Sequence, residues 1–134
     1  MALNLPPISI GGRRSLATNE VELRALLRQL IEKNIAIMSR GKPGDFPAIA
    51  TTRVRYHREP TGMEIWQTAD QLLRTGFGDC EDLAAYEAAR LVLKGVRAQG
   101  HLKRVNGGYH VQVLIDGSRI WDPSAALGMG RAPI

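Results

Sequence analysis

The segment from Leu83 to Leu93 constrains the fold more than any other part of the chain, because it is apolar on nearly every side. Its apolar residues include Leu83, Ala84, Ala85, Tyr86, Ala88, Ala89, Leu91 and Leu93. Asp79 precedes the segment as a good helix N-cap, and Gly95 follows it as a stop. A helix that is apolar all round is buried. We therefore expect a central helix that other elements cover.

Two further helices are expected before the central one. Leucines at helical spacing predict a helix from a cap at Asn19 to about Met38. A capping-box pattern at residues 68–71 predicts a second, short helix. Residues 41–62 are rich in Pro and Gly and indicate a long connection, and residues 1–17 indicate an extended N-terminal arm.

The chain after the central helix changes to a β pattern. Residues 96–105, 109–115 and 119–121 alternate or are rich in β-forming residues, with turn sequences between them. Helices followed by an antiparallel meander indicate an α+β fold. The length of 134 residues fits a single domain, so we assign residues 1–134 to one.

Charge and hydropathy limit the kinds of partner. The net charge of +5 arises entirely from residues 1–60, which carry ten basic and five acidic groups. No basic stripe is interleaved with aromatic residues, so we favour solvated basic faces over a nucleic-acid surface. No apolar run approaches the roughly 20 residues of a membrane span. The first residues lack the pattern of a secretory signal, so we expect no export by a signal peptide.

Cys80 is the one cysteine, which excludes an internal disulfide and suggests a cytosolic thiol. It directly follows the predicted cap, where free N–H groups and the helix dipole favour a thiolate. Its own N–H could help to bind an oxyanion, and Gly76 and Gly78 would keep the approach open. The carboxylates of Asp79, Glu81 and Asp82 oppose the thiolate. We expect the helix terminus and a protonated histidine to prevail; a buried, inert cysteine is the alternative.

Hairpin geometry selects His110 as the partner. A three-residue loop at residues 115–117 would pair Leu114 with Ser118, and hence His110 with Asp122. A base and its orienting carboxylate would then meet on one face of the hairpin. A two-residue turn would instead put them on opposite faces.

The other histidines, His57 and His101, lie in a loop and a glycine-led strand, and we expect both at the surface. Structural zinc needs four ligands, usually in paired spacing, and one cysteine with scattered histidines does not supply them. We therefore expect no metal or other cofactor.

Three motifs together carry a resemblance to a known family. They are Gly78-Asp79-Cys80-Glu81-Asp82-Leu83-Ala84, Tyr109-His110-Val111-Gln112-Val113 and Trp121-Asp122-Pro123-Ser124. In this set the chain resembles the transglutaminase-like cysteine peptidase superfamily, over roughly residues 50–130. It is most similar to a group of short proteins encoded by tailed bacteriophages, which share further motifs at residues 54–56, 59–60, 64–66 and 122–129.

The resemblance implies a papain-like core, with Cys80, His110 and Asp122 as catalytic groups. It implies hydrolysis or acyl transfer at amide bonds of a protein or peptide, and leaves protease, deamidase and transglutaminase open. Papain-like enzymes use a Gln for the oxyanion and transglutaminases a Trp, so Gln67 and Trp66 are candidates; core packing is the alternative for Trp66, and a polar position at the start of a helix for Gln67.

The resemblance also implies a place in the bacterial host cytoplasm or in the virion. The rival hypothesis is a phage structural or virion-assembly protein, with other phage structural proteins as partners, that keeps the fold without the chemistry.

Overall fold

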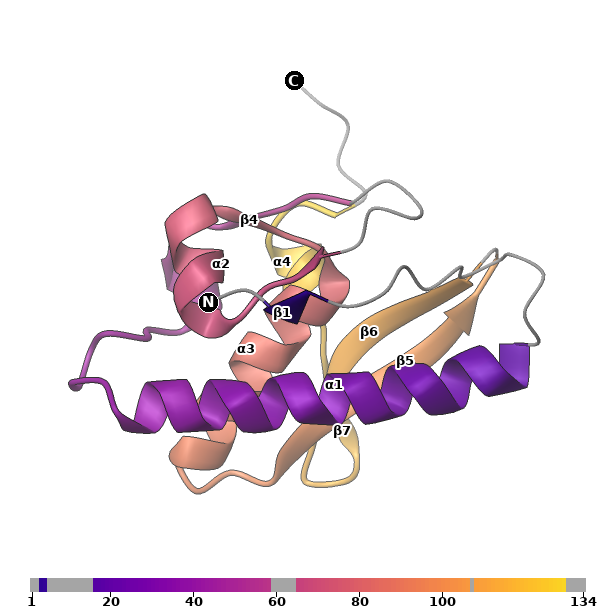
Figure 1. Ribbon diagram of the computed structural model, residues 1–134, viewed down its shortest axis with the longest axis horizontal. Coiled ribbons are helices and arrows are strands. Elements are labelled where there is room, and N and C mark those ends of the chain that lie inside the picture. Colours follow the sequence, from indigo (N-terminus) through magenta and orange to yellow (C-terminus); the bar gives the residue numbers. More distant parts are fainter. Residues whose placement is uncertain (1–2, 5–15, 59–64, 107, 130–134) are drawn as a thin grey trace.

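The computed structural model describes residues 3–4, 16–58, 65–106 and 108–129. In chain order its elements are β1 (Leu3–Asn4), α1 (Leu16–Ser39), a 3-10 turn (Ile49–Thr51), β2 (Arg55–Tyr56), β3 (Ile65–Trp66), α2 (Ala69–Thr75), β4 (Phe77–Gly78), α3 (Cys80–Leu93), β5 (Ala98–Val105), β6 (Gly108–Ile115), β7 (Arg119–Trp121) and α4 (Pro123–Ala126). Helices followed by the antiparallel sheet β5-β6-β7 confirm the α+β class (Figure 1). None of the described helices has both the length and the apolar character to cross a membrane.

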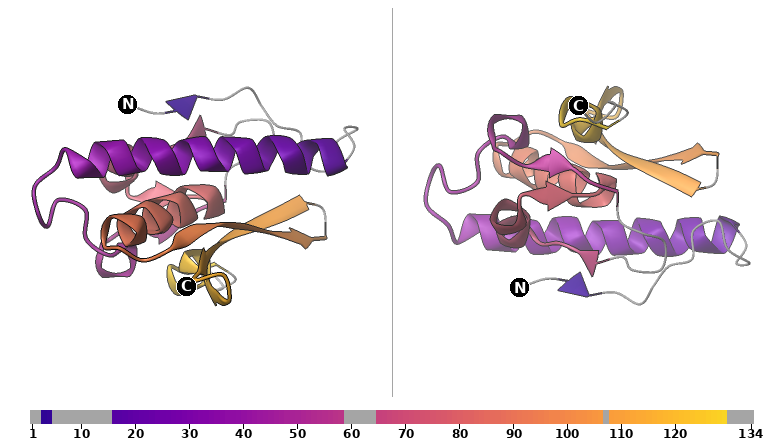
Figure 2. Two further views of the ribbon diagram at one scale, coloured as in Figure 1. Left: turned by 90° about the horizontal axis from the view of Figure 1, so that it is seen from below. Right: turned by 90° about the horizontal axis from the view of Figure 1, so that it is seen from above.

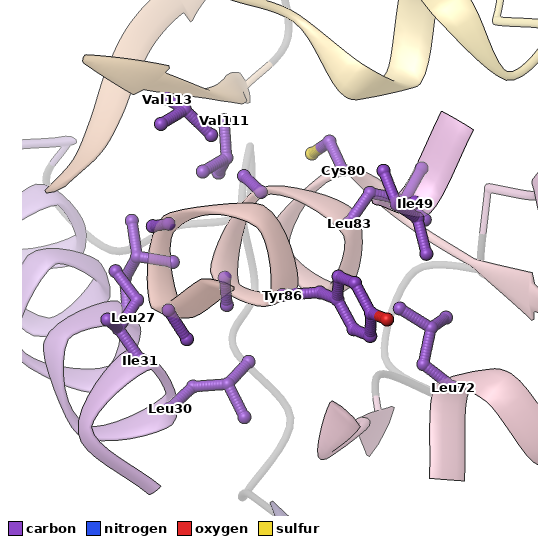
Figure 3. Close-up of a cluster of buried hydrophobic side chains, with 14 of the residues drawn as sticks. Leu27, Leu30, Ile31, Ile49, Leu72, Cys80, Leu83, Tyr86, Val111 and Val113 are labelled. Atoms are coloured by element: carbon purple, nitrogen blue, oxygen red, sulfur yellow. The ribbon is translucent and has the colours of Figure 1, made fainter. Parts of the chain in front are cut away.

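Helix α3 is the centre of the molecule, as the sequence predicts. It lies between α1 on one side and the three-stranded sheet on the other (Figure 2). All ten residues from Cys80 to Ala89 are buried. Leu27, Leu30 and Ile31 of α1 lie on one side of the helix, and Val111 and Val113 of β6 lie on another (Figure 3). The core therefore forms around the segment that has no polar face.

The start of α1 differs from the prediction. The helix begins at Leu16, inside the predicted arm, so Asn19 lies in its first turn and the predicted cap there is wrong. Leu16 and Ala17 are good helix formers, which favours the longer helix. Of the rest of the arm, the structure describes Leu3–Asn4, a strand that pairs with β3; residues 1–2 and 5–15 lie outside the described residues, as do 59–60 and 64 of the family motifs.

Helix α2 is present, but the predicted capping box does not cap it. The hydroxyl of Thr68 donates to Asp70 Oδ1 at 2.7 Å instead of accepting a backbone N–H. The N–H of Ala69 donates to Asn34 Oδ1 of α1 at 2.8 Å. Asn34 is fully buried. A side chain 35 residues earlier in the chain thus caps α2, and local sequence gives no sign of it.

A short parallel ladder leads into α3. Strand β2 pairs with β4 in the register Arg55 with Phe77 and Tyr56 with Gly78. The N–H of Arg55 donates to Gly76 O at 3.0 Å, and that of His57 donates to Gly78 O at 2.8 Å. The ladder fixes the main chain immediately before Asp79 and Cys80.

Candidate active site

Cys80 occupies the first position of α3, as predicted. Asp79 is extended (φ −82°, ψ 175°) and acts as the N-cap. Asp82 completes a capping box by accepting the N–H of Asp79 at 3.2 Å. Asp82 also accepts the N–H of Gln67 at 2.8 Å. The two carboxylates thus satisfy backbone donors that a helix start leaves free, and they hold Cys80 in place.

One expectation about this helix start is wrong. Asp79 Oδ1 accepts the N–H of Cys80 at 2.7 Å, so that N–H is not available to an oxyanion. Gly78 packs closely, because a Cβ there would lie 2.5 Å from Leu72 Cδ1. Gly76 ends α2 in the left-handed region at φ 80°, which favours glycine.

The thiol of Cys80 lies in an enclosed, mostly apolar environment. Leu23 and Leu27 of α1, Leu102 of β5 and Val111 of β6 line a small pocket with it. Cys80 points toward Val111 in Figure 3. The thiol donates to Glu81 Oε2, with 3.5 Å between the two atoms. Both residues are buried, with 8% of Cys80 and 6% of Glu81 exposed. The resting partner of the thiol is therefore a carboxylate.

This environment raises the pKa of Cys80 well above the ordinary thiol value. Burial is the largest cause, and the negative charges of Glu81 and Asp79 add to it; the backbone N–H of Val111 acts in the opposite direction. The expectation of an acid-shifted thiol is therefore wrong for this conformation. The helix terminus does not outweigh desolvation and two adjacent carboxylates.

The hairpin that carries His110 and Asp122 has a different register from the predicted one. Strands β6 and β7 pair Ile115 with Arg119 and Leu114 with Ile120, so the predicted pairing of Leu114 with Ser118 is wrong by two residues. The loop lies at 116–118, with positive φ at Asp116 and Gly117. A register shift of two residues leaves every side chain on the same face of the sheet. The prediction that His110 and Asp122 share one face is therefore correct.

His110 and Asp122 form a close pair. His110 Nε2 and Asp122 Oδ2 are 2.8 Å apart. Gln112 Nε2 donates to the same Oδ2 at 3.2 Å, and the N–H of Ala125 donates to Oδ1 at 3.2 Å. Burial acts to raise the pKa of Asp122, but the hydrogen bonds from His110, Gln112 and Ala125 outweigh it and lower the pKa. Asp122 is thus an ionised acceptor at neutral pH, so Nε2 carries a proton and Nδ1 is the basic nitrogen of a neutral His110.

The thiol of Cys80 contacts the main chain of β6 next to His110 but does not contact the imidazole. The N–H of Val111, which interacts with the thiol, directly follows His110 in the chain. Side chains alternate along the strand, so Tyr109 and Val111 face the pocket of Cys80 while His110 and Gln112 point to the other side. No hydrogen bond joins Cys80 to His110 among the described residues. The structure thus brings His110 and Asp122 together, whereas the thiol of Cys80 lies on the other side of β6 and is hydrogen-bonded to Glu81.

The two oxyanion candidates differ. Gln67 Nε2 donates to Phe77 O at 2.7 Å and to Asp82 Oδ2 at 3.3 Å, and Gln67 Oε1 accepts from Thr75 at 2.7 Å. This amide is fully used within the fold, so Gln67 is excluded as the oxyanion donor. Trp66 lines the pocket of Cys80, and within the described structure its buried Nε1 has no hydrogen-bond partner.

Sequence reasoning assigned no role in the site to Gln112 or Tyr56, and it expected the negative charge of Glu81 near the thiol but not the hydrogen bond. Glu81 accepts from the thiol, and Gln112 donates to Asp122. Tyr56 lies close enough to Asp79 and Cys80 that, after burial, their charges contribute most to raising the pKa of its phenol. Gln112 could have been found from the period of β6, since it shares a face with His110. His57 is exposed as expected, whereas His101 is only partly exposed.

One group of side chains has the composition of a metal site. Donor atoms of Asp79, Cys80 and Glu81 lie within 4.8 Å of one another, and all three residues are buried. The Asp79 carboxylate already caps α3 through Cys80 N–H. Three donors, one of them committed to the helix, fall short of the four that a structural zinc site uses.

Comparisons of the chain with protein-family models, with curated proteins and with solved structures give no significant match.

Proposed function

We propose that this protein is a cysteine-dependent amide-bond hydrolase or acyl transferase with a transglutaminase-like, papain-fold core, acting on a protein or peptide. The observation that carries the proposal is the 2.8 Å contact between His110 Nε2 and Asp122 Oδ2, which leaves Nδ1 as a base next to the peptide group that faces the thiol. A nucleophile, a base and a carboxylate that orients the base are what this chemistry requires.

The reaction requires the thiol of Cys80 to leave Glu81 and to reach His110, whose side chain lies on the other side of β6 in this conformation. Nδ1 takes the thiol proton, and the thiolate attacks the amide carbonyl. The C–N bond then breaks, the imidazolium gives its proton to the departing amine, and a thioester with Cys80 remains. Water or a primary amine, deprotonated by His110, releases the acyl group and restores the thiol. Asp122 orients the imidazole and stabilises its charged form.

Trp66 is the proposed oxyanion donor. A buried indole N–H without a partner costs about 1–3 kcal/mol. An oxyanion formed at Cys80 would supply the missing acceptor at the moment when negative charge develops. Gln67 has no part in this step.

A thiol alkylation assay tests the proposal without knowledge of the substrate. His110→Ala should lower the iodoacetamide reaction rate of Cys80 at pH 7 by about tenfold, which corresponds to about one pKa unit. His101→Ala, the same change on the neighbouring strand, is the control and should leave the rate unchanged. A rate that is identical in wild type and His110→Ala from pH 5 to 10 would refute a catalytic pair.

The burial and raised pKa of Cys80 favour a second candidate, a non-catalytic phage structural or virion-assembly protein that retains the fold. An assay with casein as a general amide substrate, with and without a fluorescent primary amine, separates the two candidates. Cleavage, ammonia release or amine incorporation that Cys80→Ala abolishes supports the enzyme. An unreactive thiol, together with recovery of the protein in purified virions, supports the structural role; an active enzyme would be found in the host cytoplasm or carried in the particle.

A further inference from the structure

A surface rich in arginine lies on the outer side of β2, next to the start of α3. Its members are Arg53, Arg55, His57, Arg58 and Phe77, and we call it the β2 surface. All five side chains are exposed. Phe77 is 56% exposed, which is high for a large apolar side chain. Its ring packs against His57, with the ring centroids 5.9 Å apart.

Strand alternation produces this surface. Val54 is buried and Tyr56 is half-buried, whereas Arg53, Arg55 and His57 are exposed on the other side. Arg58 follows His57, is also exposed and lies near the phenol of Tyr56 at the edge of this surface. Arg55 lies opposite Phe77 in the parallel register, so the two share the outer face. The N–H of His57 donates to the carbonyl oxygen of Gly78 in β4 at 2.8 Å. Because Gly78 lies two residues before Cys80, this hydrogen bond fixes the β2 surface close to the start of α3.

The charge of this surface is not balanced by the part of the chain that the structure describes. No ion pair joins Arg53, Arg55 or Arg58 to an acidic residue among the described residues. Arginine binds carboxylates through two parallel N–H groups, and an exposed aromatic ring adds apolar contact. A partner with carboxylates spaced along an extended chain fits this combination.

We propose that the β2 surface binds acidic side chains of the protein or peptide whose amide bond Cys80 attacks, so that the substrate is an acidic segment. That the bound segment is a substrate rests on the proposed function, but the binding itself does not require catalysis. Tyr56 and Arg55 occupy opposite sides of one strand, the first toward Cys80 and the second outward. A segment that crosses β2 could thus contact both.

Binding of a fluorescein-labelled peptide of alternating Glu and Gly tests the surface, measured by anisotropy with the Cys80→Ala protein to prevent turnover. The triple variant Arg53→Gln, Arg55→Gln and Arg58→Gln should raise Kd at least tenfold. The matched control removes three exposed positive charges from α1 and the residue that follows it, with Arg28→Gln, Lys33→Gln and Arg40→Gln, and should change Kd less than twofold.

Equal weakening by both triple variants, or no measurable binding by the parent, would overturn the proposal. Tighter binding of a single-stranded oligonucleotide than of the peptide would also overturn it, since the surface would then recognise phosphate. The outcome is independent of the proposed chemistry. Loss of the His110 effect on alkylation with peptide binding intact refutes only the enzyme, and loss of peptide binding with that effect intact refutes only the acidic substrate.

Discussion

Glu81→Gln should make Cys80 more acidic and more reactive. The substitution keeps the size of the side chain and removes the charge that lies beside the thiol. Glu81 Oε2 and Cys80 Sγ are 3.5 Å apart, and both residues are buried. At an effective dielectric constant of about 20, two charges at this separation repel by about 5 kcal/mol. At about 1.4 kcal/mol per pKa unit, loss of this repulsion could lower the pKa of Cys80 by at most about three units.

A fall of about two units is therefore expected, and burial keeps the thiol pKa above its ordinary value. At neutral pH the thiolate fraction would rise about 100-fold, but the less basic thiolate is about tenfold less nucleophilic, so reaction with a disulfide reagent should rise about tenfold. The assay is the rate of reaction with dithiodipyridine between pH 6 and 11, from which the pKa is fitted.

Glu32→Gln is the control, because it removes an exposed carboxylate from α1 and leaves the site unchanged. A pKa that moves equally in both variants would show that only the net charge matters. If the pKa of Cys80 stays the same in Glu81→Gln, the carboxylate of Glu81 does not perturb the thiol, and burial alone accounts for the raised pKa.

Three further results are expected. Asn34→Ala should lower the free energy of unfolding by about 1–3 kcal/mol in urea titrations, because the buried N–H at the start of α2 loses its acceptor. Gly78→Ala should cost about 1–3 kcal/mol in the same assay, since the new methyl group would lie 2.5 Å from Leu72 Cδ1. The lowered pKa of Asp122 means that its contribution to stability is complete above about pH 4 and is lost as pH falls through the folded-state pKa; Asp122→Asn should remove this part of the acid dependence, and an unchanged acid profile would contradict it.

Local sequence was sufficient for the elements that carry the site. The Asp79 cap, the central helix and the meander follow from capping chemistry and hydrophobic period, which act within a few residues. The shared face of His110 and Asp122 was also predictable, although the register was not. A slip of two residues keeps every side chain on its face, whereas a slip of one would have separated them.

The contacts that were not predictable join residues far apart in the chain. Asn34 caps a helix that begins 35 residues later, and Gln67 is held by Asp82 across 15 residues. Gln67 had the right chemistry for an oxyanion donor, but tertiary packing had already used its amide. Glu81 is adjacent to Cys80 in sequence, yet its rotation toward the thiol depends on burial under α1 and the sheet.

One of the carboxylates that position Cys80 also raises the pKa of its thiol. Asp79 and Asp82 satisfy the first N–H groups of α3, and without them the start of the helix would lose its cap. Asp79 also places negative charge beside the buried thiol, and Glu81 adds to it. Mutating Asp79 would therefore change the position and the pKa of Cys80 together, whereas Glu81 affects the pKa and is not part of the capping box. In the proposed reaction the thiol becomes a nucleophile only after it leaves Glu81 for His110. Because His110 lies on the other side of β6 from the pocket of Cys80, the site must rearrange before this chemistry begins.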